Sequence, residues 1–133
     1  MDEPIRLALA RGGVIDITTT GRRTGQPRRI EIVYHVIDRR IYISGRPNPE
    51  RRRSWLANLE AHPDFTFHLK REVRADLHAT ARVVTDEAER REILAHVARA
   101  WNRTDLDQMV AHSPLVEATI EGLDNRLGGG RGG

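Results

Sequence analysis

The chain has 133 residues with 38% hydrophobic and 31% charged side chains, a balance that favours one folded domain and excludes a disordered chain. It has no cysteine, which excludes disulfides and thiolate metal sites, and no apolar run approaches the roughly 20 residues of a membrane-spanning helix. The formal net charge is +3, and the start, Met1-Asp2-Glu3-Pro4, lacks the pattern of a secretory signal, so we expect a cytoplasmic protein.

Alternating apolar positions, many of them β-branched, predict strands along most of the chain. The first such segment is Val-Ile-Asp-Ile-Thr-Thr-Thr, and the second places Ile30, Ile32, Tyr34 and Val36 on one face. The turn at residues 38–40 is short enough to join the second and third strands as a hairpin. The predicted strands cover residues 14–20, 28–37, 41–44, 65–70, 73–84 and 115–121.

Two helices, and a third short one over residues 3–11, are predicted between or before these strands. One begins with Asn48 as N-cap and Pro49 in the first turn, and ends before Pro63. The other covers residues 86–102, where Asp86 and Glu89 have the spacing of a capping box.

Short connections and hairpins indicate an antiparallel sheet, and about six strands suggest a closed or half-closed barrel. The predicted fold is therefore mainly β, of the α+β type, with two or three flanking helices. We expect one domain over residues 1–127 and a flexible Gly/Arg tail over residues 128–133. The strand–helix–strand alternation of a Rossmann fold is missing, and the Gly21–Gly25 turn lacks the Lys-Ser/Thr of a P-loop.

Basic residues are concentrated in the first half of the chain. Lys70 is the only lysine, and ten arginines stand between Gly21 and Arg53 against three acidic residues. Glycines and hydroxyls surround four of these arginines in the segment Thr-Thr-Thr-Gly-Arg-Arg-Thr-Gly-Gln-Pro-Arg-Arg. Arginine binds phosphate and carboxylate with a planar fork, so the asymmetry predicts an anionic ligand on this half. A solvated basic turn is the alternative interpretation.

Two further segments accompany that turn. Ser-Gly-Arg-Pro-Asn-Pro, residues 44–49, leads into the predicted helix, whose first amides could face an anion or a polar ring edge. Trp55 and Asn58 share one face of this helix and could flank a planar ring, although packing of the tryptophan on the barrel is the simpler explanation.

The sequence carries no recognisable metal or nucleophile motif. The six histidines, at positions 35, 62, 68, 78, 96 and 112, have no ligand spacing that is typical of a metal site. Tyr42 or Ser44 could act near a ligand, but neither has a visible activating base.

Taken together, the four segments Thr-Thr-Gly-Arg-Arg-Thr-Gly-Gln-Pro-Arg, Ile-Glu-Ile-Val-Tyr, Ile-Tyr-Ile-Ser-Gly and Trp-Leu-Ala-Asn-Leu-Glu-Ala-His-Pro resemble the deazaflavin-dependent nitroreductase family in order and spacing. The resemblance runs from about Ile17 to Val84 and includes the closing strand near Val116. It implies a split β-barrel that binds coenzyme F420, whose phosphate and polyglutamate tail would explain the arginines; flavin mononucleotide (FMN) is the alternative cofactor.

The resemblance also implies roles for particular residues. The phosphate-side loop of the family corresponds to Arg22, Arg23, Thr24 and Arg28. Arg46 lies at the position near the cofactor where the family often has lysine. Trp55 and Asn58 match positions of the helix that lines the cofactor groove. The implied reaction is hydride transfer from reduced F420 to a small organic acceptor such as a quinone, a nitro compound or an enone. We nominate Tyr34, Tyr42 or Ser44 as the proton donor.

Two other functions are considered. A non-catalytic binder of F420, FMN, haem or a fatty acid is suggested by the lack of an evident acid–base pair. A nucleic-acid-binding barrel is suggested by the arginines but disfavoured, because aromatic residues make up only 5% and form no stacking platform.

Because split barrels often pair through a sheet face, we expect a homodimer.

Overall fold

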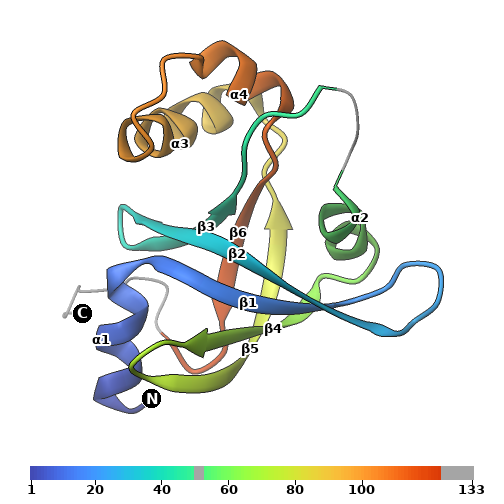
Figure 1. The fold of residues 1–133 in the computed structure, drawn as a ribbon, viewed down its shortest axis with the longest axis vertical. Helices are drawn as coiled ribbons and strands as arrows, with labels where there is room; N and C mark the ends of the chain where they lie inside the picture. The colour runs from blue at the N-terminus through green and yellow to red at the C-terminus, as the bar shows by residue number, and fades with distance from the viewer. Residues whose placement is uncertain (50–52, 124–133) are drawn as a thin grey trace.

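Antiparallel strands close into a barrel in the order β1-β2-β3-β6-β5-β4 (Figure 1). The computed structural model describes residues 1–49 and 53–123 of the chain. Within this part the strands are β1 (Gly13–Thr20), β2 (Pro27–Ile37), β3 (Arg40–Ser44), β4 (Asp64–Lys70), β5 (Arg74–Val83) and β6 (Leu115–Ile120). The predicted mainly β fold with six strands is confirmed; the tail at residues 128–133 lies outside the described residues.

The two-residue period of β1 shows why the sheet closes. Ile15, Ile17 and Thr19 are buried inside the barrel, whereas Asp16 and Thr18 face outward. Ile17 pairs with Ile30 of β2 on one side and with Phe67 of β4 on the other, so β1 closes the ring. A register shift of one residue would turn every one of these apolar side chains to solvent.

The barrel interior is filled by large side chains from opposite strands. Ile15, Ile17, Ile43 and Phe67 have no accessible surface. The rings of Tyr34 and Phe67 meet edge to face, with centroids 5.1 Å apart and an interplanar angle of 75°. The barrel interior is therefore a packed core.

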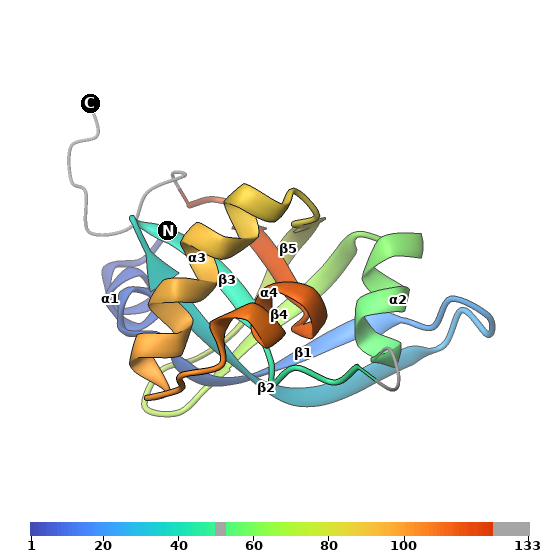
Figure 2. The same cartoon turned by 90° about the horizontal axis from the view of Figure 1, so that it is seen from above.

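Helices surround the barrel (Figures 1 and 2). The structure assigns α1 (Glu3–Arg11), α2 (Ser54–Ala61), α3 (Glu87–Ala100) and α4 (Leu106–His112) in the described residues. α3 and α4 pack together over one end, α1 lies toward the other, and α2 stands beside the projecting β1–β2 hairpin. None of these helices has both the length and the apolar content that a membrane span requires.

One helix was missed, and the predicted start of another is corrected. α4 was not predicted, because it has only seven residues and buries only Met109 and Val110. α2 begins at Ser54 with Arg53 as its N-cap residue, and not at Asn48 and Pro49. The backbone N–H of Asn48 instead donates to the carbonyl of His112 at 3.5 Å, which holds this segment against the end of α4.

Arg90 fixes the position of α4. Its guanidinium donates to the carbonyls of Val84, Met109, Val110 and Ser113 at 2.6–3.3 Å. Three of these acceptors belong to the last turn of α4 and the residue after it, and one of them, the Met109 carbonyl, also accepts from the Ser113 N–H at 2.8 Å. Carbonyls at a helix end otherwise lack partners within the helix. α3 itself begins as predicted, since the Asp86 side chain accepts from the Glu89 N–H at 2.9 Å.

Candidate cofactor-binding site

A cavity of about 580 Å³ lies between the β1–β2 hairpin and α2. Its volume is within the range of small-molecule and cofactor sites. Six of the residues that the sequence predicted for the cofactor line it: Arg22, Arg23, Thr24, Arg28, Trp55 and Asn58. We call this cavity the arginine pocket. The structure thus brings together a turn and a helix that are more than 25 residues apart in the sequence.

The arginine-bearing turn has a defined backbone. The Gly21 N–H donates to the Gln26 carbonyl at 2.8 Å, and the Gly25 N–H donates to the Gly21 carbonyl at 2.9 Å. Gly25 has a positive φ of 71°, which favours glycine. At Gly21 a Cβ would lie 2.8 Å from the Thr24 hydroxyl, which itself accepts from the Gln26 N–H. The two glycines therefore allow a tight turn that points its arginines toward the cavity.

Asn58 ties this turn to α2. Its Oδ1 accepts from the backbone N–H of Arg22 at 3.0 Å, and its Nδ2 donates to the Thr19 hydroxyl at 3.1 Å. The side chain is only 4% exposed. The amide predicted to line the cofactor groove thus bonds the protein through both its oxygen and its nitrogen, and it positions Arg22.

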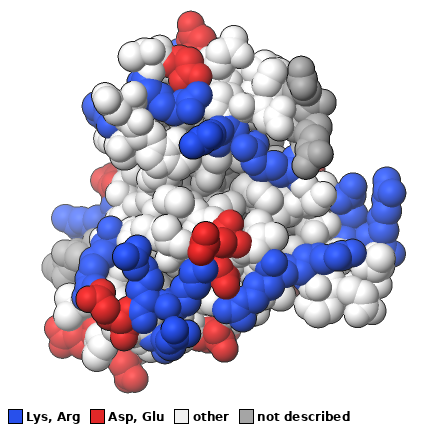
Figure 3. Space-filling view, viewed as in Figure 1, with Lys and Arg blue, Asp and Glu red and all other residues white. Residues whose placement is uncertain are grey.

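Arg22, Arg23 and Arg28 lack acidic partners among the described residues. All three are exposed, and none forms an ion pair with a residue of ranges 1–49 or 53–123. Arg29 is the informative contrast: it follows Arg28 on the opposite face of β2 and pairs with Asp16 at 2.9 Å. Figure 3 shows basic side chains gathered along the projecting hairpin. Uncompensated guanidiniums on a cavity wall attract anions.

Trp55 lies between the barrel core and the arginine pocket. It is 9% exposed and belongs to the barrel core cluster, and it also lines the arginine pocket together with Ile30. An aromatic face beside an aliphatic one provides an apolar wall on which a planar ring can stack.

The three nominated proton donors lie elsewhere. The Tyr34 hydroxyl donates to the carbonyls of Ala8 and Leu9, and burial raises its pKa to about 12. Tyr42 is buried in the α3–α4 cluster, where burial raises the pKa of its phenol. The Ser44 hydroxyl donates to the Pro114 carbonyl at 2.8 Å. None of the three lines the arginine pocket.

Arg46 lies outside the arginine pocket, and Arg53 lines it. Arg46 is exposed and does not line the pocket, although its carbonyl accepts from Arg53 Nη2 at 2.7 Å. Arg53, which the sequence reasoning passed over, lines the pocket beside Ser54. Its place two residues before Trp55, at the true start of α2, is the signal that could have found it.

The residues present suit a planar cofactor with an anionic tail. Guanidiniums and the Thr24 hydroxyl surround one part of the cavity, and Trp55 with Ile30 forms an apolar part. Among the residues that the structure describes, no group of three or more His, Asp and Glu side chains could hold a metal ion.

Solved structures share this fold at low sequence identity. A conserved hypothetical protein from Mycobacterium tuberculosis is 20% identical with a TM-score of 0.68, covering 91% of this chain and 81% of that one. A chain described as an F420 reductase is 11% identical with a TM-score of 0.68, covering 95% and 100%. A chain described as a domain-swapped dimer is 18% identical with a TM-score of 0.59, covering 80% of each.

The family assignment comes from the sequence itself. Residues 5–116 match the model of the family described as F420H(2)-dependent quinone reductase, so the match includes the arginine-bearing turn, α2 and all but the end of the barrel. The chain therefore belongs to the F420H2-dependent quinone reductase family, whose cofactor and reaction class are those predicted from its sequence.

Proposed function

We propose that the chain reduces a quinone and that the arginine pocket binds the anionic part of F420. The carrying observation is that Arg22, Arg23 and Arg28 line one cavity without an acidic partner among the described residues. When bound, the reduced cofactor supplies a hydride, and it is a two-electron donor. The protein's contribution is to bind and orient it.

Each part of the pocket has a role in this proposal. The guanidiniums of Arg22, Arg23 and Arg28 bind phosphate and carboxylate oxygens in charge-assisted hydrogen bonds. Trp55 offers its face to the ring system, and Asn58 keeps the turn at a fixed distance from α2. Such fixed placement lowers the entropic cost of reaching the reactive geometry.

Proton delivery needs no buried acid in this proposal. A quinone that accepts a hydride also needs one proton, and the exposed rim at Arg22 and Arg23 leaves the pocket open to water. Tyr34, Tyr42 and Ser44 stay nominated donors, but each hydroxyl must first leave its present surroundings to act.

Arg28 and Arg29 provide a matched test of the anion site. We expect Arg28→Ala to weaken F420 binding by about 1–3 kcal/mol, the scale of a charge-assisted hydrogen bond, and the loss to shrink as salt rises. Arg29→Ala removes the same charge from the other face of β2 and should change F420 affinity little. Fluorescence titration of both variants measures this. Equal losses would show a general charge effect and would contradict the assignment.

A non-catalytic binder is the rival function. It is favoured by one observation, namely that no nominated proton donor lines the arginine pocket. Mixing the protein with stoichiometric reduced F420 and menadione distinguishes the two. An enzyme restores the absorbance of oxidised F420 faster than the protein-free mixture, whereas a binder does not.

The predicted homodimer and cytoplasmic location are also proposals. The closed barrel removes exposed sheet edges as a reason for pairing, because β1 pairs with β4. Support comes instead from the fold relative that is described as a domain-swapped dimer. Light scattering tests the dimer, and a monomer mass at high protein concentration would contradict it.

A further inference from the structure

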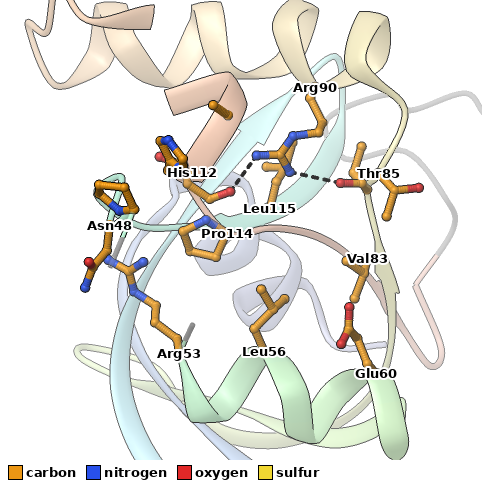
Figure 4. A pocket seen from close by; sticks show the side chains of 14 residues that line it. Asn48, Arg53, Leu56, Glu60, Val83, Thr85, Arg90, His112, Pro114 and Leu115 are labelled. Atoms are coloured by element: carbon orange, nitrogen blue, oxygen red, sulfur yellow. Dashed lines mark hydrogen bonds between the residues drawn. The ribbon is translucent and has the colours of Figure 1, made fainter. Parts of the chain in front are cut away.

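A second cavity lies on the other face of α2. It has a volume of about 570 Å³ and is bounded by α2, the end of β5 and the connection from α4 to β6 (Figure 4). Its apolar wall includes Leu56, Val83, Pro114 and Leu115. Charged and polar side chains line the remainder, so the cavity suits an occupant of mixed polarity. We call it the proline cavity, after Pro49 and Pro114 in its wall.

Two opposite charges stand at the two ends of its floor. Arg53 is the N-cap residue of α2, and Glu60 belongs to the last turn, on the same side of the helix. In Figure 4 their side chains rise from the two ends of α2, with Leu56 between them. The seven residues from one to the other correspond to about 10 Å along the helix axis. The Arg46 carbonyl accepts from Arg53 Nη2 at 2.7 Å, which holds the guanidinium at its end of the cavity.

The order of these two charges is the reverse of the order that stabilises a helix. A helix carries partial positive charge at its start and partial negative charge at its end, so acidic residues favour the start and basic residues the end. α2 has no acidic residue in its first turn and no basic residue in its last turn. The charges of Arg53 and Glu60 therefore add to the helix dipole along the floor of the cavity. A molecule with a carboxylate at one end and an ammonium at the other is attracted at both ends.

We propose that the proline cavity binds a short peptide with free termini, about three residues long, whose carboxylate contacts Arg53 and whose ammonium contacts Glu60. An extended tripeptide spans about 10 Å, which matches the axial distance between the two charges. Small apolar side chains of the peptide pack on Leu56, Pro114 and Leu115. The proposal does not depend on the proposed function, because Glu60 and the apolar wall belong to the proline cavity and not to the arginine pocket.

The cavity also offers hydrogen-bonding groups to the amides of a peptide. Thr85 is exposed at the rim. Ser113 is 4% exposed, and its hydroxyl has no hydrogen-bond partner in the described structure, so a turn of this side chain toward a peptide amide breaks no bond. Arg90 plays no such part, because its guanidinium donates to four carbonyls and shapes the cavity wall (Figure 4).

Trialanine with free termini is the probe, and two blocked forms are matched to it. N-Acetyl-trialanine lacks the ammonium, and trialanine amide lacks the carboxylate. Each is titrated into the full chain, and proton–nitrogen correlation spectra give both the dissociation constant and the amides that shift. Glu60→Gln and Arg53→Gln each remove one of the two charges. Glu92→Gln and Arg6→Gln remove exposed charges outside both cavities. Melting curves show whether each variant folds.

We expect trialanine to shift amide signals around the proline cavity, those of Leu56 and Leu115 among them. Each blocked form should bind about tenfold more weakly, the fold-change of losing one charge-assisted contact. Glu60→Gln should weaken trialanine binding by the same factor and leave the binding of N-acetyl-trialanine unchanged, because that form has no ammonium to lose. Arg53→Gln should act in the same way on trialanine and trialanine amide. Both control variants should behave like the wild-type protein.

Several results would overturn the proposal. One is equal affinity for trialanine and its blocked forms, and another is a set of shifts that gathers at the arginine pocket. If a folded Glu60→Gln variant binds trialanine as tightly as Glu92→Gln does, Glu60 does not hold the ammonium and the assignment is wrong. Absence of any shift at millimolar trialanine also contradicts it.

Discussion

Variants of Asn58 can test whether this side chain acts by positioning the arginine-bearing turn or by contacting the ligand directly. Asn58→Ala removes the acceptor of the Arg22 N–H and the donor to the Thr19 hydroxyl, both at about 3 Å and the latter fully buried. Leaving a buried polar group unpaired costs about 1–3 kcal/mol. We therefore expect Asn58→Ala to lower the free energy of unfolding by about 2–4 kcal/mol and, since Arg22 loses its anchor, to weaken F420 binding as well.

Asn58→Asp is the matched variant. Its carboxylate still accepts from the Arg22 N–H, and the Thr19 hydroxyl can reverse its bond and donate. Stability should stay within about 1 kcal/mol of wild type, whereas the negative charge beside the arginines should weaken F420 binding. Urea unfolding with and without F420 measures both quantities. If Asn58→Ala is as stable as wild type, the account of how α2 fixes the turn is wrong.

Three further predictions concern the rest of the fold and the ring wall. Arg90→Leu should lower the free energy of unfolding by about 2–4 kcal/mol, because the carbonyls at the end of α4 lose their hydrogen-bond donors. Arg90→Lys should recover only part of this loss, because lysine lacks the planar fork of arginine. Urea unfolding of both variants measures the change. Burial lowers the pKa of His35, whose Nε2 has no partner in the described structure and whose ring meets Trp101 at 5.1 Å. His35 of the unfolded chain takes up a proton near pH 6.5, whereas His35 of the folded chain does so only at lower pH. The free energy of unfolding should therefore be highest above pH 6.5 and decrease as the pH falls below it. In urea unfolding, His35→Gln should make the free energy of unfolding less dependent on pH in this range. Trp55→Ala should slow turnover at saturating F420 more than Arg28→Ala does, and a melting curve separates this from the loss of core packing.

Much of the barrel could be predicted from the sequence, because the alternation of apolar and polar residues that marks a strand is a local pattern. Alternation in β1 and β2 determines which side chains face inward, and the observed strand ends differ from the predicted ones by no more than one residue. The start of α2 was misplaced because Asn48-Pro49 has the local form of a helix start. Its backbone is instead held by His112, a contact between residues distant in the sequence.

The candidate site also has parts that local sequence patterns indicate and parts that depend on residues distant in the sequence. The arginine-bearing turn and the Trp55–Asn58 face are short motifs, and the family resemblance they carry implied that both lie at the cofactor groove. The structure places their residues on one cavity. The surroundings of the nominated hydroxyls could not be predicted from the sequence. The carbonyls that accept from Tyr34 and Ser44 belong to Leu9 and Pro114, which are 25 and 70 residues away. The direction of Arg46 likewise depends on the path between β3 and α2, which no local rule determines.

A titration of the wild-type protein with F420 and with FMN, in parallel at moderate salt, tests the central claim most directly. If Arg22, Arg23 and Arg28 form the site for an anionic tail, F420 binds more tightly than FMN, and its advantage decreases as salt is raised. Equal affinities, or tighter binding of FMN, would contradict the assignment of this pocket to F420.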